Sequence, residues 1–191
     1  MGGAKSLHPM DHVGIDTCSA VSVSTETADF LFVDRSYEAK NSISLNGVGN
    51  GGPVILGRGP MVVSSLNASG EQIFLVDPAG VLISKQSKLR ILGQQKMKRL
   101  GFHVVQSFET KEDNLIYRNE IIIPLTTING ILMVKSVPWC LNDLQIDKLN
   151  ELLDQDRDND RDDHCFSIND LDKVRVSSLK EMNDAETVAL S

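Results

Sequence analysis

Short, largely apolar runs of three or four residues recur along the first 140 residues of this chain. Glycine and proline gather between them, as at residues 47–53, 57–60 and 67–70. Regular short strands with such breaks are typical of an all-β barrel or sandwich. The runs occupy residues 31–33, 43–45, 54–56, 61–63, 73–76, 81–83, 102–105, 121–123 and 131–134.

One stretch departs from this pattern. Between residues 88 and 101, Met97 and Leu100 are spaced as on one face of a helix, and Gly101 follows them. A glycine in this place is typical of a helix C-terminus. We therefore predict one short helix within the otherwise all-β region.

Charge divides the chain into two parts. The chain has 191 residues and a formal net charge of −7. Residues 141–191 contain 14 acidic and 6 basic residues, which leaves 12 acidic and 13 basic residues before them. We therefore predict a flexible N-terminus over residues 1–10, a near-neutral β domain over residues 11–137 and an acidic tail over residues 138–191. Apolar residues between positions 144 and 153 allow a short helix in that tail, and the aspartate-rich residues 154–163 are expected to be disordered.

The composition excludes several classes of partner. An acidic chain is a poor match for the phosphate backbone, so no nucleic-acid binding is expected. No apolar run is long enough to span a bilayer, and the first ten residues lack the apolar core of a secretory signal. Three scattered cysteines do not make a disulfide framework. We expect an intracellular, cytoplasmic protein without membrane contact.

Few residues offer cofactor chemistry. His8, His12 and Cys18 lack the further ligand that a zinc site needs. The glycines of residues 47–52 match a dinucleotide-binding pattern, but Pro53 follows where that pattern requires a helix. We therefore predict neither a metal nor any other cofactor.

The first candidate for chemistry is an aspartate that directly follows an apolar run. Asp16 comes after His12-Val-Gly-Ile, and small residues follow it, which suits a strand that ends in a tight turn. An aspartate in this setting is often an ordinary turn residue whose carboxylate accepts hydrogen bonds from nearby backbone N–H groups. Two later features favour another role: the glycine-rich, hairpin-like residues 47–59, and Ile91-Leu-Gly directly before the predicted helix.

In this order and spacing the chain resembles a retropepsin, and in particular the proteases of copia-type retrotransposon polyproteins. The resemblance covers roughly residues 10–110 and implies a closed β-barrel with one short helix. It implies that Asp16 is the catalytic carboxylate, that Thr17 braces the active-site turn across a subunit interface, and that Ser19 completes the turn.

The resemblance also implies a role for two supporting groups of residues. One group would form the flap that closes over a bound peptide, and the other would support the active-site turn from its end and from beneath. The flap residues are Gly47, Val48, Gly49, Gly51 and Gly52, and the supporting residues are Ala20, Ile91, Leu92 and Gly93.

The implied reaction requires two carboxyl groups that share one proton. The chain has one Asp-Thr motif of this kind, and Asp77-Pro-Ala-Gly80 reads as a turn. An active enzyme would therefore be a homodimer with one Asp16 from each chain, in keeping with closed two-fold symmetry. The expected function is that of a dimeric aspartic endopeptidase that cuts polypeptides, including its own polyprotein.

Cys18 departs from the family, which has glycine directly after the Asp-Thr pair. A side chain here could crowd the dimer interface, so a second hypothesis is a catalytically inactive retropepsin-like interaction module or a decayed retroelement fragment. A third is an unrelated β-sandwich in which Asp16 caps a turn. A fourth makes Cys18 a nucleophile with His12 or His103 as its base.

Overall fold

The fold is mostly β, as the sequence predicted. The computed structural model describes residues 11–42, 45, 53–84, 89–106, 112–139, 141–155 and 165–167. The predicted flexible N-terminus and all five predicted flap residues lie outside these ranges. The elements are β1 (His12–Asp16), β2 (Val23–Ser24), η2 (Thr27–Asp29), α1 (Tyr37–Asn41), β3 (Ile55–Leu66), β4 (Gln72–Ile83), β5 (Arg90–Gly93), α2 (Gln94–Arg99), β6 (Phe102–Gln106), β7 (Asp113–Tyr117), β8 (Ile121–Ile128), β9 (Ile131–Lys135), α3 (Asp143–Gln155) and β10 (Cys165–Ser167).

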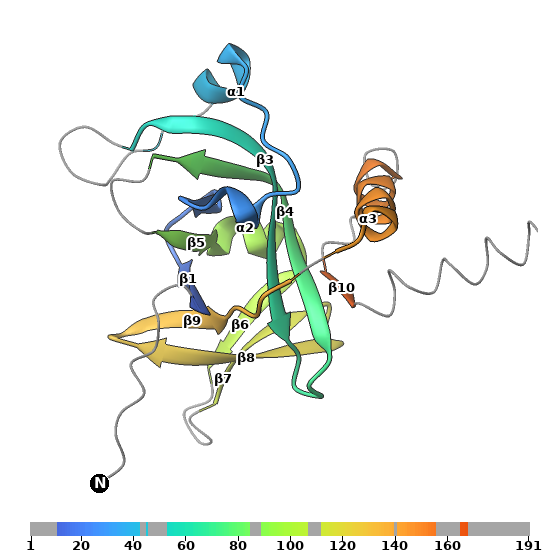
Figure 1. Cartoon of the computed structure of the whole chain (residues 1–191). Coiled ribbons are helices and arrows are strands. Elements are labelled where there is room, and N and C mark those ends of the chain that lie inside the picture. Colours follow the sequence, from blue (N-terminus) through green and yellow to red (C-terminus); the bar gives the residue numbers. More distant parts are fainter. Residues whose placement is uncertain are drawn as a thin grey trace, which may run out of the picture.

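All the described strands belong to one curled sheet. Its order is β10-β4-β2-β5-β1-β9-β8-β7-β6, with β3 paired to β4. The long β3–β4 hairpin runs across the meander of β7, β8 and β9, as Figure 1 shows. Two strand pairs are parallel, β1 with β5 and β2 with β4, and they lie in the middle of the sheet.

The sheet is a half-barrel, which corrects the prediction of a closed barrel. Closure requires the strands at the two ends of a sheet to pair along their length. Within the described residues, β6 pairs only with β7, and single hydrogen bonds link the β3–β4 hairpin to the meander instead. Val137 N–H donates to Ser64 O at 2.9 Å, and Ala68 N–H donates to Ile122 O at 2.7 Å. The hairpin therefore covers the core by crossing the meander rather than by extending a ladder.

The main core lies between the hairpin and the rest of the sheet. Alternate residues of β1, Val13 and Ile15, enter it together with Met61 and Val63 of β3. Leu92 of β5 joins the same cluster at 1% exposure. The two faces of β1 are thus distinct, and His12, Gly14 and Asp16 face away from this core.

The predicted short helix is confirmed as α2, and Gly101 ends it with a φ of +88°. The prediction of a single helix in the β domain was wrong, because α1 is also present. Ser36 caps α1 by accepting a hydrogen bond from Ala39 N–H at 3.1 Å. Five residues are too few for a periodic apolar pattern, so only this cap marked the helix in the sequence.

Asp77-Pro-Ala-Gly80 lies inside β4 and is not the turn that the sequence suggested. The register between β3 and β4 shifts between Gly59 and Met61, opposite this segment. The Asp77 carboxylate accepts a hydrogen bond from Ala79 N–H at 2.9 Å and lies 4.0 Å from the ammonium group of Lys96. The turn-forming residues therefore make a bulge within a continuous strand.

Part of the predicted tail packs against the β domain. Helix α3 lies on the outer side of the β3–β4 hairpin (Figure 1). Leu149 and Leu141 bury against Val62 and Phe74 of that hairpin. Strand β10 adds a short antiparallel ladder to β4. The predicted boundary at residue 137 thus separates segments that share a buried cluster. None of the described helices is both long and apolar enough to cross a membrane.

We expect the substitution Leu149→Ala to lower the free energy of unfolding by about 2–5 kcal/mol, because it leaves a cavity in the cluster beneath α3. Leu144→Ala is the matched control, since Leu144 lies on the same helix but is 66% exposed. Its effect should stay within about 0.5 kcal/mol. Urea unfolding of the full chain measures both, and equal effects would contradict the packing of α3.

Candidate active site

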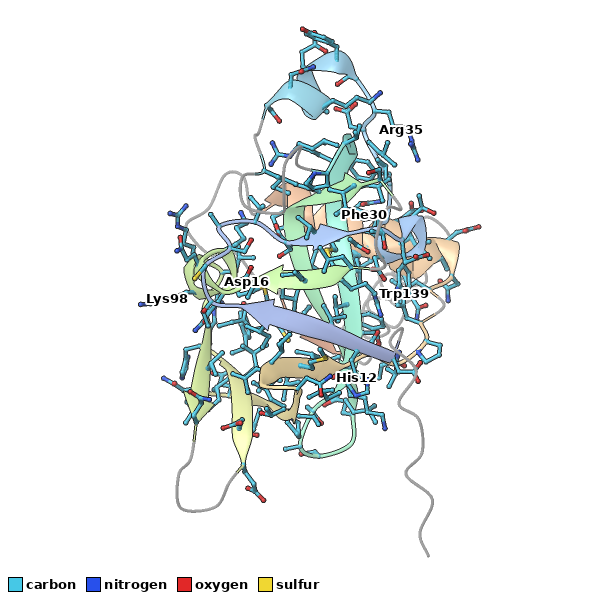
Figure 2. All side chains as sticks on the ribbon, turned by 90° about the vertical axis from the view of Figure 1, so that its left-hand side faces the viewer. His12, Asp16, Phe30, Arg35, Lys98 and Trp139 are labelled. Carbon is cyan, nitrogen blue, oxygen red and sulfur yellow. The ribbon has the colours of Figure 1, made fainter. Side chains whose placement is uncertain are left out.

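Asp16 is the last residue of β1 and lies beside β5. The two strands are parallel, with Gly14 opposite Ile91, Ile15 opposite Leu92 and Asp16 opposite Gly93. The predicted catalytic residue and the predicted supporting triplet, 75 or more residues apart in the sequence, therefore meet in adjacent strands. Figure 2 shows Asp16 at one end of β1 and His12 at the other.

A tight turn follows Asp16 and is closed by its own hydrogen bonds. Cys18 N–H donates to the Asp16 carboxylate at 2.9 Å, and Ser19 N–H donates to the Asp16 carbonyl at 3.3 Å. The Ser19 hydroxyl donates to the Val21 carbonyl at 2.6 Å. One oxygen of the Asp16 carboxylate is thus held by the turn, and the side chain is half-buried.

Gly93 allows the turn to rest directly on β5. A β-carbon at this position would lie 2.5 Å from the carbonyl oxygen of Val21, closer than atoms of this kind can approach. Gly93 N–H donates to the buried Ser22 hydroxyl at 3.2 Å. Gln95 N–H of α2 donates to the Ser19 carbonyl at 3.3 Å. The start of α2 and the end of β5 therefore support the turn from beneath.

Asp16 opens into a cleft of about 810 Å³. The cleft runs along the face of β1 that is turned away from the main core, where His12, Gly14 and Asp16 alternate with the core residues. Ile91 of β5 and three apolar residues of β9, which are Ile131, Leu132 and Met133, contribute apolar parts of its walls. The complete lining is His12, Gly14, Ile15, Asp16, Thr17, Leu89, Arg90, Ile91, Gln106, Ile128, Asn129, Gly130, Ile131, Leu132 and Met133.

A buried ion pair stands behind the cleft. Arg90 lines the cleft and donates to both carboxylate oxygens of Asp29, at 2.8 and 2.6 Å. Ser24 donates a further hydrogen bond to Asp29 at 2.6 Å. Asp29 is 4% exposed, so this bidentate pair compensates a charge that would be costly to bury alone. The pair ties η2 to β5 and holds the strand that supports Asp16.

The predicted site residues differ in how the structure places them. Asp16, Ser19, Ile91, Leu92 and Gly93 are brought together around one turn. Thr17 and Ala20 belong to the same turn and are exposed. The Thr17 hydroxyl lies 3.8 Å from the sulfur of Cys18. A brace across a subunit interface, as predicted for Thr17, would require a second chain.

Asp16 is the sole carboxylate among the residues that line the described cleft. No group of three or more histidine, cysteine, aspartate or glutamate side chains within the described ranges could hold a metal ion. A single carboxylate can accept a proton or orient water, whereas acid–base cleavage of an amide by carboxyls needs a pair. The described cleft therefore offers one carboxylate, and a carboxyl pair would require a second one.

Sequence reasoning missed the far wall of the cleft. The Asn129-Gly130 pair, with φ values of +52° and +80°, forms the tight turn between β8 and β9 and brings Ile131 over Gly14. An Asn-Gly pair between apolar runs is a strong hairpin signal that could have placed this turn. The pairing of β9 with β1 could not be predicted from a local sequence pattern, because it joins distant parts of the chain.

We expect the substitution Gly93→Ala to lower the free energy of unfolding by about 1–3 kcal/mol, because the new methyl group forces the Val21 backbone away from β5. Gly14→Ala is the matched control: its β-carbon would meet its nearest neighbours at 3.7 Å, an ordinary contact. Its effect should stay below about 1 kcal/mol. Denaturant unfolding of both full-length variants provides the comparison, and a tolerated Gly93→Ala would contradict the close approach.

Comparisons with known proteins found no match. The chain matches no family model, no curated protein and no solved structure. The turn that carries Asp16, the three β5 residues beneath it and the cleft beside it are the features that bear on function.

Proposed function

We propose that this chain is an aspartic endopeptidase of the retropepsin type, from a copia-type retrotransposon polyprotein, and that it acts as a homodimer. One observation carries the proposal. Asp16 stands at the end of a strand, on a tight turn supported by Ile91-Leu92-Gly93, at one end of a cleft of about 810 Å³. The residues that the resemblance names as catalytic and supporting thus lie around one turn.

The reaction would use two Asp16 carboxyl groups, one from each protomer. Two carboxyls about 3 Å apart share one proton, because like charges so close do not both ionise. The ionised carboxyl takes a proton from water as the water oxygen attacks the peptide carbonyl carbon. The protonated carboxyl gives its proton to the carbonyl oxygen. As the tetrahedral intermediate collapses and the C–N bond breaks, the carboxyl that took the water proton gives it to the leaving nitrogen, and the other carboxyl takes a proton back from a hydroxyl of the intermediate.

The other turn residues would position these carboxyls. Cys18 N–H donates to one oxygen of the Asp16 carboxylate at 2.9 Å. The hydrogen bond from the Ser19 hydroxyl to the Val21 carbonyl fixes the backbone that follows the turn. Thr17 is exposed on the turn, where a second copy could reach its hydroxyl. In this proposal an extended peptide lies in the cleft and forms backbone hydrogen bonds with the enzyme. Residues 47–52 remain the predicted flap.

Cys18 favours a second candidate, a catalytically inactive module that keeps the fold and the dimer surface. Its side chain is exposed at the tip of the turn, where the family has glycine. Two such turns approach closely in the proposed dimer, so two sulfur-bearing side chains would meet there. If they hold the Asp16 carboxyls apart, the dimer forms but does not cleave.

We expect the full chain to cleave an unfolded protein substrate between about pH 4 and 7, the range in which a carboxyl dyad holds one proton. Asp16→Asn should lower kcat/KM by about 1,000-fold or more, since it removes the acid and base together. Glu120→Gln, at an exposed position on another turn, is the control and should retain activity. Specific activity should rise with protein concentration. Cleavage by Asp16→Asn at the parental rate would overturn the assignment.

We also expect mild oxidation to link two chains through Cys18, because the proposed dimer brings two Asp16 turns face to face. Non-reducing electrophoresis would show a dimer band that is absent from the Cys18→Ser variant. A reductant would convert this band to monomer. A band that persists in Cys18→Ser would place the contact elsewhere. A Cys18-dependent band from a sample without protease activity would favour the inactive module over the enzyme.

A further inference from the structure

His12 is a nearly buried histidine at the end of the cleft opposite Asp16. Its side chain is 7% exposed and lines the cleft. Because Val13 and Ile15 belong to the core, the alternation of β1 turns His12 and Asp16 to the cleft side together. Figure 2 shows the two residues at opposite ends of the strand. The proposed proteolysis uses Asp16 and gives His12 no part.

The imidazole of His12 has hydrogen-bonding capacity that the described residues do not use. In the part of the chain that the structure describes, no protein group pairs with the ring, and the ring nitrogens are not among the enclosed unpaired atoms, so they are open to the cleft. An imidazole carries an N–H donor in both of its charge states. Water or a ligand in the cleft can therefore pair with the ring nitrogens. A hydrogen-bond acceptor lying in the cleft would complete this pairing.

The charged side chain beside His12 and the charged side chain of Asp16 have opposite sign. Lys135 of β9 is the register partner of His12, so the two side chains lie beside each other on one face of the sheet. The charge of Arg90, which also lines the cleft, is matched by Asp29. Asp16 supplies the negative charge at the other end. A carboxylate is therefore favoured near His12 and disfavoured near Asp16.

The strand itself sets the distance between these two ends. His12 and Asp16 are four residues apart, which in a strand is about 13 Å at a rise of about 3.3 Å per residue. An extended peptide beside β1 has nearly the same rise. A peptide whose scissile bond lies at Asp16 therefore brings a side chain about four residues away to His12.

We infer that the His12 end of the cleft binds an acidic side chain of the substrate, about four residues from the bond that is cut. This inference rests on the proposed function. Because a homodimer is two-fold symmetric, each protomer supplies one such site. Glutamate or aspartate is therefore selected on both sides of the scissile bond. His12 is a specificity-determining residue, and Lys135 strengthens its attraction for the carboxylate.

The experiment measures peptide binding to the full-length Asp16→Asn variant, which binds without cutting. The probes are three fluorescein-labelled peptides, each with a central pair of phenylalanines. The first has glutamate four residues from the centre on each side, and the second has glutamine there. The third has glutamate two residues from the centre. Fluorescence anisotropy at pH 5.5 gives the dissociation constants.

We expect the first peptide to bind about tenfold more tightly than the second, as a hydrogen bond to a charged group provides. The third should show no such gain. Adding His12→Gln should abolish the preference, and adding the exposed Lys135→Gln should reduce it by about threefold. Lys98→Gln, an exposed lysine of α2, is the charge-matched control and should preserve it.

Each contrary outcome has a distinct meaning. Equal binding of the first two peptides would overturn the His12 site and leave the protease proposal standing. Binding of no peptide would overturn both, since the cleft would then not hold an extended chain. Should His12→Gln unfold, as circular dichroism would reveal, Lys135→Gln against Lys98→Gln still decides whether positive charge at this end of the cleft selects the acidic peptide.

Discussion

The parallel pairing of β1 with β5 is the contact on which the site depends. It places Asp16 opposite Gly93, and the absence of a side chain at Gly93 lets the Val21 backbone lie against β5. The turn from Asp16 to Val21 is then held by two hydrogen bonds, from Cys18 N–H to the Asp16 carboxylate and from the Ser19 hydroxyl to the Val21 carbonyl. Parallel strands need a long connection between them, so every element from β2 to β4 is built into the loop that this pairing closes.

A second constraint comes from the long hairpin of β3 and β4. One of its faces closes the main core, and the other would expose Val62, Phe74 and Val76 to water without α3. Burying such side chains stabilises a fold by about 1.5–3 kcal/mol each. Part of the acidic C-terminal segment therefore belongs to the folded structure, because its Leu141 and Leu149 cover this face. A hairpin apolar on both faces requires a partner on both sides.

The cleft arises from the two faces of β1. The core takes Val13 and Ile15, which leaves His12, Gly14 and Asp16 to line the open side. The same alternation explains why a catalytic candidate and a candidate recognition residue share one wall. The residue between Asp16 and His12 on this wall is Gly14, and the side chain of Ile131 lies over it. The buried pair of Arg90 and Asp29 then holds β5 in place without adding net charge to the cleft.

The sequence by itself determined what depends on near neighbours in the chain. Short apolar runs separated by glycine and proline indicated the β class, Gly101 marked the end of α2, and an aspartate after an apolar run located the turn at Asp16. Tertiary structure alone decided which strands meet. Neither the pairing of β9 with β1, nor the bulge at Asp77 within β4, nor the packing of Leu149 on the hairpin has a local signal. The physical reason is that local patterns report which face of an element is apolar, whereas the partner of that face is chosen by the packing of the whole chain.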